Sequence, residues 1–354
     1  MNHRSIHTAF PATRDAFPHE PIASLPTPVT PLDVAKLPGG LASLHVKRDD
    51  QTASPFGGNK LRKLEFILGE ARGEGRREII TFGFAGSNHC VATARAAKTL
   101  GIHTTSLLLP QKPTPYVAQN LVLGIEAGAT LVHRETTRGL AVALAKAWLG
   151  GLMRHRVAPK IVPAGGSSLL GMIGYVNAGL ELAEQITAGI LPCPDMLYVA
   201  LGSGGTSVGL QAGLALAGLD VEVVPVLVVE RRYMSAEKLR RMQRALASFL
   251  SARGVVLPSG WEALTGRVRG EFFGPGYGES TAESRAATEL VAREGGISLD
   301  AAYSSKAFAA LVEDARAGTL RDRHVVFWHT YGGPEQAQST SGVGGARMLD
   351  PDSL

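Results

Sequence analysis

Cysteine is nearly absent from the sequence. Cys90 and Cys193 are the 2 cysteines among 354 residues, too few for a disulfide framework or for a zinc site built from four cysteines. Residues 1–25 also lack the apolar core of a secretory signal, because Asp15 and Glu20 interrupt them. We therefore expect a cytoplasmic protein with no metal site.

The chain has no strong excess of charge of one sign. Its formal net charge is +5 and charged residues make up 19% of it, so neither general disorder nor nucleic-acid binding is indicated. The basic residues are scattered except over 231–253, where Leu239, Leu246 and Phe249 recur at helical spacing. This spacing predicts an amphipathic helix whose arginines face water. We expect no nucleic-acid partner.

One uncharged run, residues 196–219, is long enough to cross a bilayer. Glycines and hydroxyl side chains interrupt it, which fits a buried strand, a glycine-rich turn and a helix better than a lipid-facing rod. No repeat of fixed period occurs, so a solenoid or propeller is not indicated. We expect no membrane partner.

The apolar content, 45% of 354 residues, is enough for about two domains of roughly 150 residues each. Short apolar runs alternate with helical patterns along the chain. Strands are expected over 44–46, 78–82, 104–109, 130–132, 160–162, 196–201, 221–229 and 325–328, and helices over 61–72, 89–100, 141–149, 174–187, 207–217, 283–294 and after residue 306. This alternation predicts an α/β fold with parallel-rich sheets and helices on both faces.

A glycine pair precedes a predicted helix at Gly57-Gly58-Asn59-Lys60. The glycines allow a tight turn and leave Lys60 in the first helical turn, where the helix dipole lowers the pKa of an ammonium. A lysine of lowered pKa is suited to forming an imine. The alternative is an ordinary turn before a helix with solvated lysines.

The segment Gly86-Ser87-Asn88-His89 joins another predicted strand to a helix. Free amides at a helix N-terminus bind anions such as a carboxylate, and the Ser87 hydroxyl adds a donor. Serine and asparagine are also ordinary N-cap residues, so a purely structural role is the alternative.

A third turn, Gly202-Ser203-Gly204-Gly205-Thr206, lies between a strand and a helix. Consecutive glycines let several amides converge on a phosphate, and Thr206 supplies a hydroxyl beside the helix dipole. Serine stands where the dinucleotide fingerprint requires its third glycine, and the lysine of a P-loop is absent. The pattern favours a monophosphate ligand. The alternatives are a plain turn, or a dinucleotide and hence an NAD-dependent oxidoreductase.

Four further segments, 163–168, 274–278, 300–306 and 328–333, combine glycine, hydroxyl or aromatic residues beside predicted strands or helices. Together and in this order, the segments resemble the fold-type II pyridoxal-phosphate enzymes. Within them the chain is most similar to the D-cysteine desulfhydrase and 1-aminocyclopropane-1-carboxylate deaminase group. The resemblance covers residues 25–335 and is most specific at 57–65, 87–88, 164–171, 276–278 and 299–306.

The resemblance implies a cofactor site for pyridoxal 5'-phosphate. Lys60 would bind the cofactor covalently, Asn88 would hydrogen-bond its ring hydroxyl, and residues 202–206 would hold its phosphate. The ring-opening deaminases of the group have a glutamate where this chain has Ser304. A hydroxyl from Ser304 or Thr330 would instead leave the pyridine nitrogen neutral, which makes the ring a weaker electron sink.

The resemblance also implies the substrate side of the site. Ser87 would bind the carboxylate of a small amino acid and assist proton transfer, with Tyr277 and Tyr303 near the substrate. A weaker electron sink suits β-elimination better than ring opening, so we expect D-cysteine or a similar β-substituted alanine to give pyruvate and ammonia. The alternatives are a 1-aminocyclopropane-1-carboxylate deaminase, a β-replacement synthase and a catalytically silent binding protein.

By the same resemblance the chain divides into an arm and two domains. Residues 1–24 would form the arm, 25–62 with 166–354 a larger cofactor-binding domain, and 63–165 a smaller inserted α/β domain. The fold would be similar to that of tryptophan synthase β, and the protein a homodimer. Two departures stand out, because Gly86 replaces the usual glutamine of the group and the usual arginine three residues after Asn88 is absent.

Overall fold

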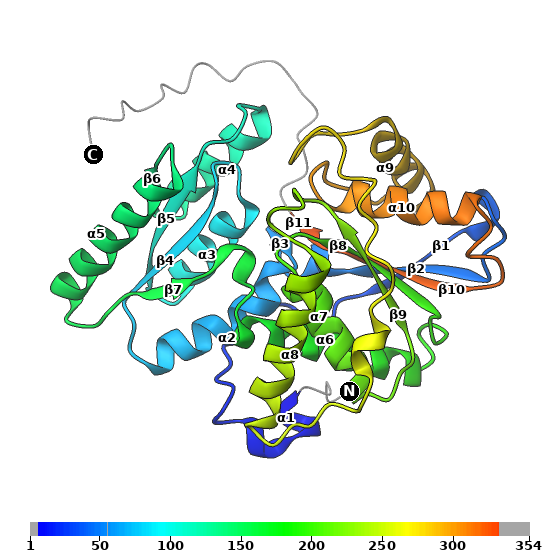
Figure 1. The fold of residues 1–354 in the computed structure, drawn as a ribbon, viewed down its shortest axis with the longest axis horizontal. Helices are drawn as coiled ribbons and strands as arrows, with labels where there is room; N and C mark the ends of the chain where they lie inside the picture. Colours follow the sequence, from blue (N-terminus) through cyan, green and yellow to red (C-terminus); the bar gives the residue numbers. More distant parts are fainter. Residues whose placement is uncertain (1–5, 55, 333–354) are drawn as a thin grey trace. The chain divides into compact units, whose positions relative to one another are not determined.

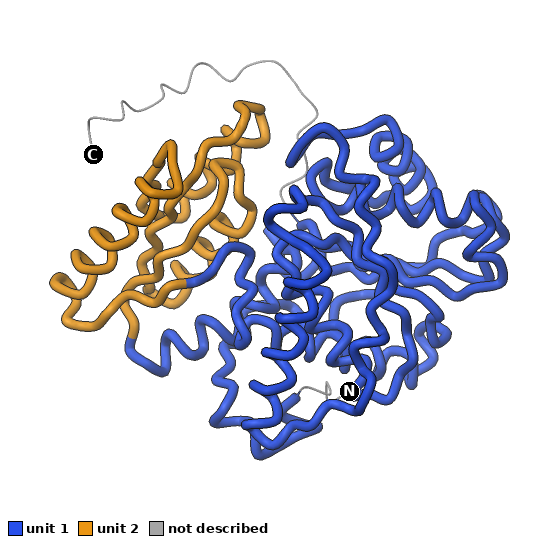
Figure 2. Tube along the Cα trace, in the orientation of Figure 1, with its two compact units in different colours: residues 1–75, 162–332 blue, residues 76–161, 333–354 orange. Residues whose placement is uncertain are grey.

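The computed structural model describes residues 6–54 and 56–332. They form two compact units (Figure 2). Unit 1 comprises the described residues up to Gly75 and from Val162 on, and unit 2 runs from Arg76 to Ile161. Residues 333–354, which the resemblance assigns to the larger domain, lie outside the described residues.

Unit 1 is built on a five-stranded sheet. In spatial order its strands are β1 (Val29–Leu32), β2 (Ser43–Arg48), β10 (His324–His329), β8 (Met196–Leu201) and β9 (Glu222–Leu227) (Figure 1). The last four run parallel to one another, and β1 is antiparallel to β2. The parallel-rich sheet agrees with the alternation of strands and helices in the sequence.

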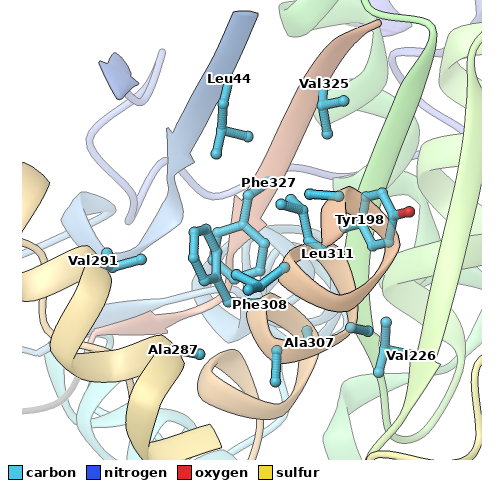
Figure 3. Close-up of a cluster of buried hydrophobic side chains, with 14 of the residues drawn as sticks. Leu44, Tyr198, Val226, Ala287, Val291, Ala307, Phe308, Leu311, Val325 and Phe327 are labelled. Carbon is cyan, nitrogen blue, oxygen red and sulfur yellow. The ribbon is translucent and has the colours of Figure 1, made fainter. Parts of the chain in front are cut away.

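One face of this sheet is covered by α9 (Ala282–Gly295) and α10 (Ser304–Arg316). Figure 3 shows the apolar side chains between them, with Phe308 of α10 close to Phe327 of β10. Their ring centroids are 5.0 Å apart and the rings meet edge to face, the arrangement that aromatic quadrupoles favour. This packing holds α10 against the face of the sheet.

The opposite face is covered by α6 (Leu169–Thr187) and α7 (Gly205–Leu216). Successive residues of a strand point to opposite faces, so Trp328 faces these helices and lies 6.1 Å from the ring of Tyr175. The remaining helices of eight or more residues in unit 1 are α2 (Lys60–Gly73) and α8 (Ala236–Ser251). The expected three-layer α/β/α fold is therefore confirmed.

Unit 2 contains a smaller sheet of the same kind. Its strands in spatial order are β6 (Thr130–His133), β5 (His103–Leu109), β4 (Glu78–Phe84) and β7 (Lys160–Val162), whose last residue already belongs to unit 1. Its helices are α3 (Asn88–Thr99), α4 (Pro115–Glu126) and α5 (Thr137–His155). Strands β4, β5 and β6 are parallel.

Two helices of unit 2 differ from the sequence-based expectation. The helix α4 was not predicted, although Thr114 caps it by accepting a hydrogen bond from the Val117 amide and Pro115 stands at its first turn. The helix α5 was expected from residue 141 and begins at Thr137, because Thr136 caps it in the same way. In both cases the cap decides where the helix starts.

The beginning of the described chain packs on unit 1. Ile6, in α1 (Ile6–Ala9), is fully buried, and its amide donates to Oδ1 of Asn177 at 2.8 Å. The Glu65 carboxylate of α2 accepts the amide of Ala23 at 3.0 Å. Among the described residues, no helix combines the length and apolar character that crossing a bilayer requires. The uncharged run 196–219 forms β8 and α7, as expected.

Candidate active site

The candidate residues of unit 1 follow the carboxyl ends of its parallel strands. Strand β2 ends at Arg48, which stands opposite His329 at the end of β10. Strand β8, on the other side of β10, ends at Leu201. The turn before Lys60, Thr330 and the loop 202–206 come after these ends. In open α/β sheets, ligands bind at this edge.

The glycine pair before Lys60 forms a short strand, β3 (Gly57–Gly58), which pairs with β11 (Tyr331–Gly332). A side chain on Gly57 would lie 2.3 Å from the carbonyl oxygen of Asp50, and Gly58 has a φ of 104°. Glycine is therefore required at both positions. Lys60 follows as the first residue of α2, where the sequence placed it.

Lys60 is half-buried, and its Nζ donates to Oδ1 of Asn59 at 2.6 Å. Burial lowers the pKa of Lys60 to about 8, whereas the carboxylate of Asp300 raises it. The direction of the pKa shift agrees with the sequence analysis, but its main cause is burial and not the helix dipole. Asn59 also donates through Nδ2 to Oγ1 of Thr206 at 3.2 Å and through its amide to the Thr330 carbonyl at 2.9 Å.

The loop 202–206 has the conformation of an anion cradle. Gly204 is the N-cap of α7 with a φ of 89° and gives that helix no side-chain cap, so first-turn amides of α7 beyond that of Gly205 are available to a ligand. The amide of Gly205 donates to Oγ of Ser167 at 3.2 Å, and Ser167 lies 2.7 Å from Oγ of Ser203. A side chain on Gly205 would collide with Ser167 at 2.5 Å.

A second lysine, Lys63, faces this loop and was missed in the sequence analysis. Its Nζ donates to Oγ of Ser167 at 3.0 Å and to the carbonyl oxygen of Gly165 at 3.1 Å. Burial lowers the pKa of Lys63 well below its ordinary value, and the charge of Lys60 lowers it further. The signal was its spacing, since a residue three positions after Lys60 lies on the same side of a helix. A bound phosphate dianion would compensate this buried amine.

Just before α10, the carboxylate of Asp300 accepts several hydrogen bonds. Asp300 accepts hydrogen bonds from the amides of Ala302, Tyr303 and Ser304 and, at 2.7 Å, from the Ser304 hydroxyl. Nδ1 of His329 lies 3.2 Å from the same hydroxyl oxygen. The hydroxyl hydrogen of Ser304 is therefore already donated.

Thr330 differs from Ser304 in this respect. It follows β10 directly and its carbonyl accepts the Asn59 amide, which keeps it beside Lys60. Its hydroxyl has no hydrogen-bond partner within residues 6–54 and 56–332. Of the two hydroxyls expected from the sequence, Thr330 is the one with a hydrogen still to donate.

The two expected tyrosines lie together. The hydroxyl oxygens of Tyr277 and Tyr303 are 2.5 Å apart. The Lys60 ammonium lies 5.6 Å from the ring centre of Tyr303, and a side chain on Gly202 would lie 3.2 Å from the same ring. The structure thus places Tyr303 beside Lys60 and the loop that begins at Gly202, with Tyr277 in contact with Tyr303.

Ser87 and Asn88 belong to unit 2. Ser87 caps α3, and its Oγ accepts the Cys90 amide at 3.4 Å. The Asn88 side chain accepts a hydrogen bond from Nδ2 of Asn120 at 2.9 Å. The structural role that the sequence left open is therefore present. Their roles toward the cofactor and the substrate stay predictions.

A glutamine, Gln111, occupies the space beside Gly86, the position at which the resemblance implies a glutamine. Oε1 of Gln111 accepts the Gly86 amide at 2.9 Å. A side chain on Gly86 would lie 3.0 Å from the same oxygen and 2.9 Å from Cγ2 of Val117. Nothing in the sequence pointed to Gln111, because it follows β5 and is distant from Ser87 along the chain.

The residues present fit pyridoxal phosphate. Lys60 is an amine of lowered pKa, the start of α7 is uncapped and faces a buried lysine, and Thr330 has a hydroxyl to donate. Imine formation, phosphate binding and a ring-nitrogen contact need these three groups. All of them lie in unit 1.

Comparisons with known proteins agree with this chemistry. Nocardicin C-9' epimerase of Nocardia uniformis subsp. tsuyamanensis is 35% identical over 325 residues, 89% of this chain and 93% of its own length. D-cysteine desulfhydrase of Serratia proteamaculans (strain 568) is 34% identical over 82% of this chain and 87% of its own. A crystal structure of an ACC deaminase homologue has a TM-score of 0.76 and 30% identity, covering 92% of this chain and 95% of that chain.

The model of a whole enzyme family also matches, over residues 23–330, which is most of the chain. Its description is that of a pyridoxal-phosphate-dependent enzyme. The match includes Lys60, the loop 202–206 and Thr330. The chain belongs to the family of pyridoxal-phosphate-dependent enzymes, and its cofactor is pyridoxal 5'-phosphate.

Proposed function

We propose that the protein eliminates the β-substituent of D-cysteine or of a similar β-substituted alanine. D-cysteine and water would give pyruvate, ammonia and hydrogen sulfide. The relative of Serratia proteamaculans, named a D-cysteine desulfhydrase and 34% identical, supports this substrate class. The family assignment leaves the NAD-dependent oxidoreductase, which was the alternative for the loop 202–206, without support.

The observation that carries the proposal is the hydrogen bonding of Ser304. Its hydroxyl donates to Asp300, whose two oxygens together accept four donors at the start of α10. Neither residue therefore offers a free carboxylate to a ring nitrogen, and Thr330 offers a hydroxyl. A hydroxyl partner leaves that nitrogen neutral. A neutral ring stores a carbanion less well, which favours prompt loss of a thiolate over opening of a cyclopropane.

Each residue of the site has a defined task in this reaction. When bound, pyridoxal phosphate would supply an electron sink for the pair left on Cα after a proton is removed. Lys60 binds the cofactor covalently and, as a free amine with a pKa of about 8, can take up the Cα proton near neutral pH. The tyrosine pair beside Lys60 holds the substrate. Ser87, in unit 2, is the proposed partner of the substrate carboxylate.

The test is a substrate panel on the holoenzyme. D-cysteine, L-cysteine, β-chloro-D-alanine and 1-aminocyclopropane-1-carboxylate are incubated separately, and pyruvate, 2-oxobutyrate, sulfide and ammonia are measured. We expect equal amounts of pyruvate, ammonia and sulfide from D-cysteine, and little 2-oxobutyrate. A protein with the absorbance of bound cofactor but no turnover would be a silent binding protein. A β-substituted product formed from added thiol without pyruvate would indicate a replacement synthase. Either result would overturn the proposal.

An epimerase is the second candidate, because the Nocardia relative of that name is 35% identical over 89% of this chain. Elimination and epimerisation both begin by removing the Cα proton and differ in whether a leaving group departs or a proton returns. D-alanine has no leaving group, so only return of a proton to Cα is possible with it. In deuterium oxide this return would place deuterium at Cα. Deuterium at Cα together with L-alanine, and no pyruvate from D-cysteine, would establish the epimerase.

Two properties of the molecule as a whole belong to the same proposal. We infer a cytoplasmic homodimer that binds a small amino acid and no nucleic acid. The resemblance in the sequence supports the dimer, and the balanced charge gives no support to a polyanionic partner. Sedimentation equilibrium of the holoenzyme at several concentrations measures the assembly, and a monomer at all of them would contradict the homodimer.

A further inference from the structure

Lys306 is a buried lysine that the proposed chemistry does not use. Its side chain, in the first turn of α10, is 0% exposed. Its ammonium donates to the carbonyl oxygens of Phe273 at 2.6 Å and Gly276 at 3.0 Å. Burial lowers the pKa of Lys306 to about 8, whereas the carboxylates of Asp300 and Glu279 raise it. The amine is therefore mostly charged at neutral pH.

Both carbonyl groups belong to the loop 273–278, which lies between the short helix ending at Leu264 and α9. The loop is rich in glycine, and Gly274 and Gly278 have φ values of 73° and 78°. Glycines give a free loop many conformations. A charged donor bonded to two carbonyl oxygens restricts such a segment, because hydrogen bonds from charged groups are the stronger ones.

The same loop carries Tyr277 to the site. The Tyr277 hydroxyl lies 2.5 Å from that of Tyr303, the residue three positions before Lys306. The rings meet edge to face with centroids 5.8 Å apart. Lys306 and Tyr303 thus attach the loop to the start of α10 at two points, and the second point lies beside Lys60.

We infer that Lys306 is a positioning residue, whose two hydrogen bonds to the loop 273–278 keep Tyr277 on Tyr303 and so set how tightly the site holds its amino-acid substrate. Lys306 acts through the loop, because its ammonium is bonded to two of the loop's carbonyl groups. The inference rests on the proposed function in one respect, that the tyrosine pair acts on the substrate.

The first test is hydrogen exchange of the holoenzyme, which needs no substrate. In Lys306→Met we expect the amides of 274–279 to exchange at least about tenfold faster, since the variant keeps the length of the side chain and loses its donors. Lys47→Met is the control for losing a buried lysine, because Lys47 is another fully buried lysine of unit 1 and donates elsewhere, to the Thr27 carbonyl, to Gln185 and to the carboxylate of Glu181. It should leave exchange in this loop unchanged. If Lys306→Met yields no folded holoenzyme, Lys306→Gln replaces it. Its shorter, uncharged amide donates more weakly than an ammonium, so exchange should still be faster, by a smaller factor.

The second test is kinetic. For Lys306→Met we expect the KM for D-cysteine to rise about tenfold while kcat changes by less than about threefold. If Lys306 acts through Tyr277, adding Lys306→Met to Tyr277→Phe should change KM by less than about twofold, the behaviour of coupled positions. Lys306→Arg, which keeps charge and donors, should restore part of the loss.

The two tests fail in different ways. An unmutated protein that makes no pyruvate from D-cysteine would refute the proposed function and leave the exchange experiment valid. Unchanged exchange at 274–279 in Lys306→Met, or additive effects in the double variant, would overturn the role of Lys306 even in an active desulfhydrase.

Discussion

The Lys60 ammonium donates to the side-chain oxygen of Asn59 at 2.6 Å, and the side-chain nitrogen of Asn59 donates to Thr206 at 3.2 Å. One carboxamide therefore connects Lys60, the amine proposed to bind the cofactor, to the loop 202–206, which is proposed to hold its phosphate. Asn59 is also the residue whose amide binds the Thr330 carbonyl. These contacts make the charge state of Lys60 the first property to measure.

The rate at which pyridoxal phosphate binds covalently to cofactor-free protein should depend on pH with a midpoint near 8. Only the neutral amine attacks an aldehyde. With a pKa of about 8, about a tenth of Lys60 is neutral at pH 7, against about one in 2,500 for an ordinary lysine. Stopped-flow absorbance between pH 6 and 10 measures the rate. A rate that still rises steeply above pH 9.5 would show that Lys60 is not perturbed.

Asn59→Asp should move this midpoint upward. A carboxylate next to the ammonium favours the charged form and raises the pKa of Lys60. Asn59→Ala removes the acceptor without adding a charge, so it should weaken cofactor affinity, by about tenfold, without an upward shift. The same pH titration on both variants separates charge from hydrogen bonding. Identical midpoints for Asn59→Asp and the unmutated protein would contradict the role given to Asn59.

Lys63→Met should weaken binding of pyridoxal phosphate by about 10–100-fold, because Lys63 faces the loop that is proposed to hold the phosphate. Pyridoxal, which has no phosphate, provides the control. Its affinity should be the same for Lys63→Met and for the unmutated protein, since Lys60 is present in both. Equilibrium titration followed by absorbance gives both constants. An equal loss for the two ligands would mean that Lys63 only stabilises the fold.

Much of the fold was predictable because the strongest sequence signals are local. The uncharged run over β8 and α7 and the alternation around it identified the sheet and its layers. The helix α4 was missed although Thr114 and Pro115 are a recognisable helix start, since the prolines before it look like a loop. The start of α5 was missed for a similar reason, because the cap at Thr136 precedes its apolar pattern.

The candidate site was predictable where each part lies in one short segment at the end of a strand. Lys60, the loop 202–206 and Thr330 are such parts. The contacts that give them their properties are long-range, as between Lys63 and Ser167, 104 residues apart in the chain. The donation of the Ser304 hydrogen to Asp300 also depends on side-chain geometry that spacing does not fix. Sequence thus located the groups, and packing decided which of them are available.

Gln111→Ala should raise the KM for the amino-acid substrate about tenfold with little change in cofactor affinity. The Gln111 side chain accepts the amide of Gly86 and occupies the space that a side chain on Gly86 would fill. Its loss should therefore disturb the turn at Ser87, which is proposed to bind the substrate carboxylate. Gln111→Glu keeps the shape and adds a negative charge, and should be worse than alanine because like charges repel. A KM for Gln111→Glu equal to that of the unmutated protein would exclude a carboxylate ligand near this side chain.

The last prediction concerns Ser304, which stands where the ring-opening deaminases have a glutamate. Ser304→Glu should produce measurable 2-oxobutyrate from 1-aminocyclopropane-1-carboxylate and lower pyruvate formation from D-cysteine, by about tenfold. The new carboxylate would be buried beside Asp300, since Ser304 is 1% exposed and bonded to it. One of two adjacent buried carboxyl groups readily keeps a proton, and a neutral pyridine nitrogen would accept a hydrogen bond or the proton itself from it, which would strengthen the electron sink. Ser304→Gln has the same shape without the charge and should not open the ring. Robust formation of 2-oxobutyrate by the unmutated protein, or by Ser304→Gln, would show that the residue at this position does not select between the two reactions.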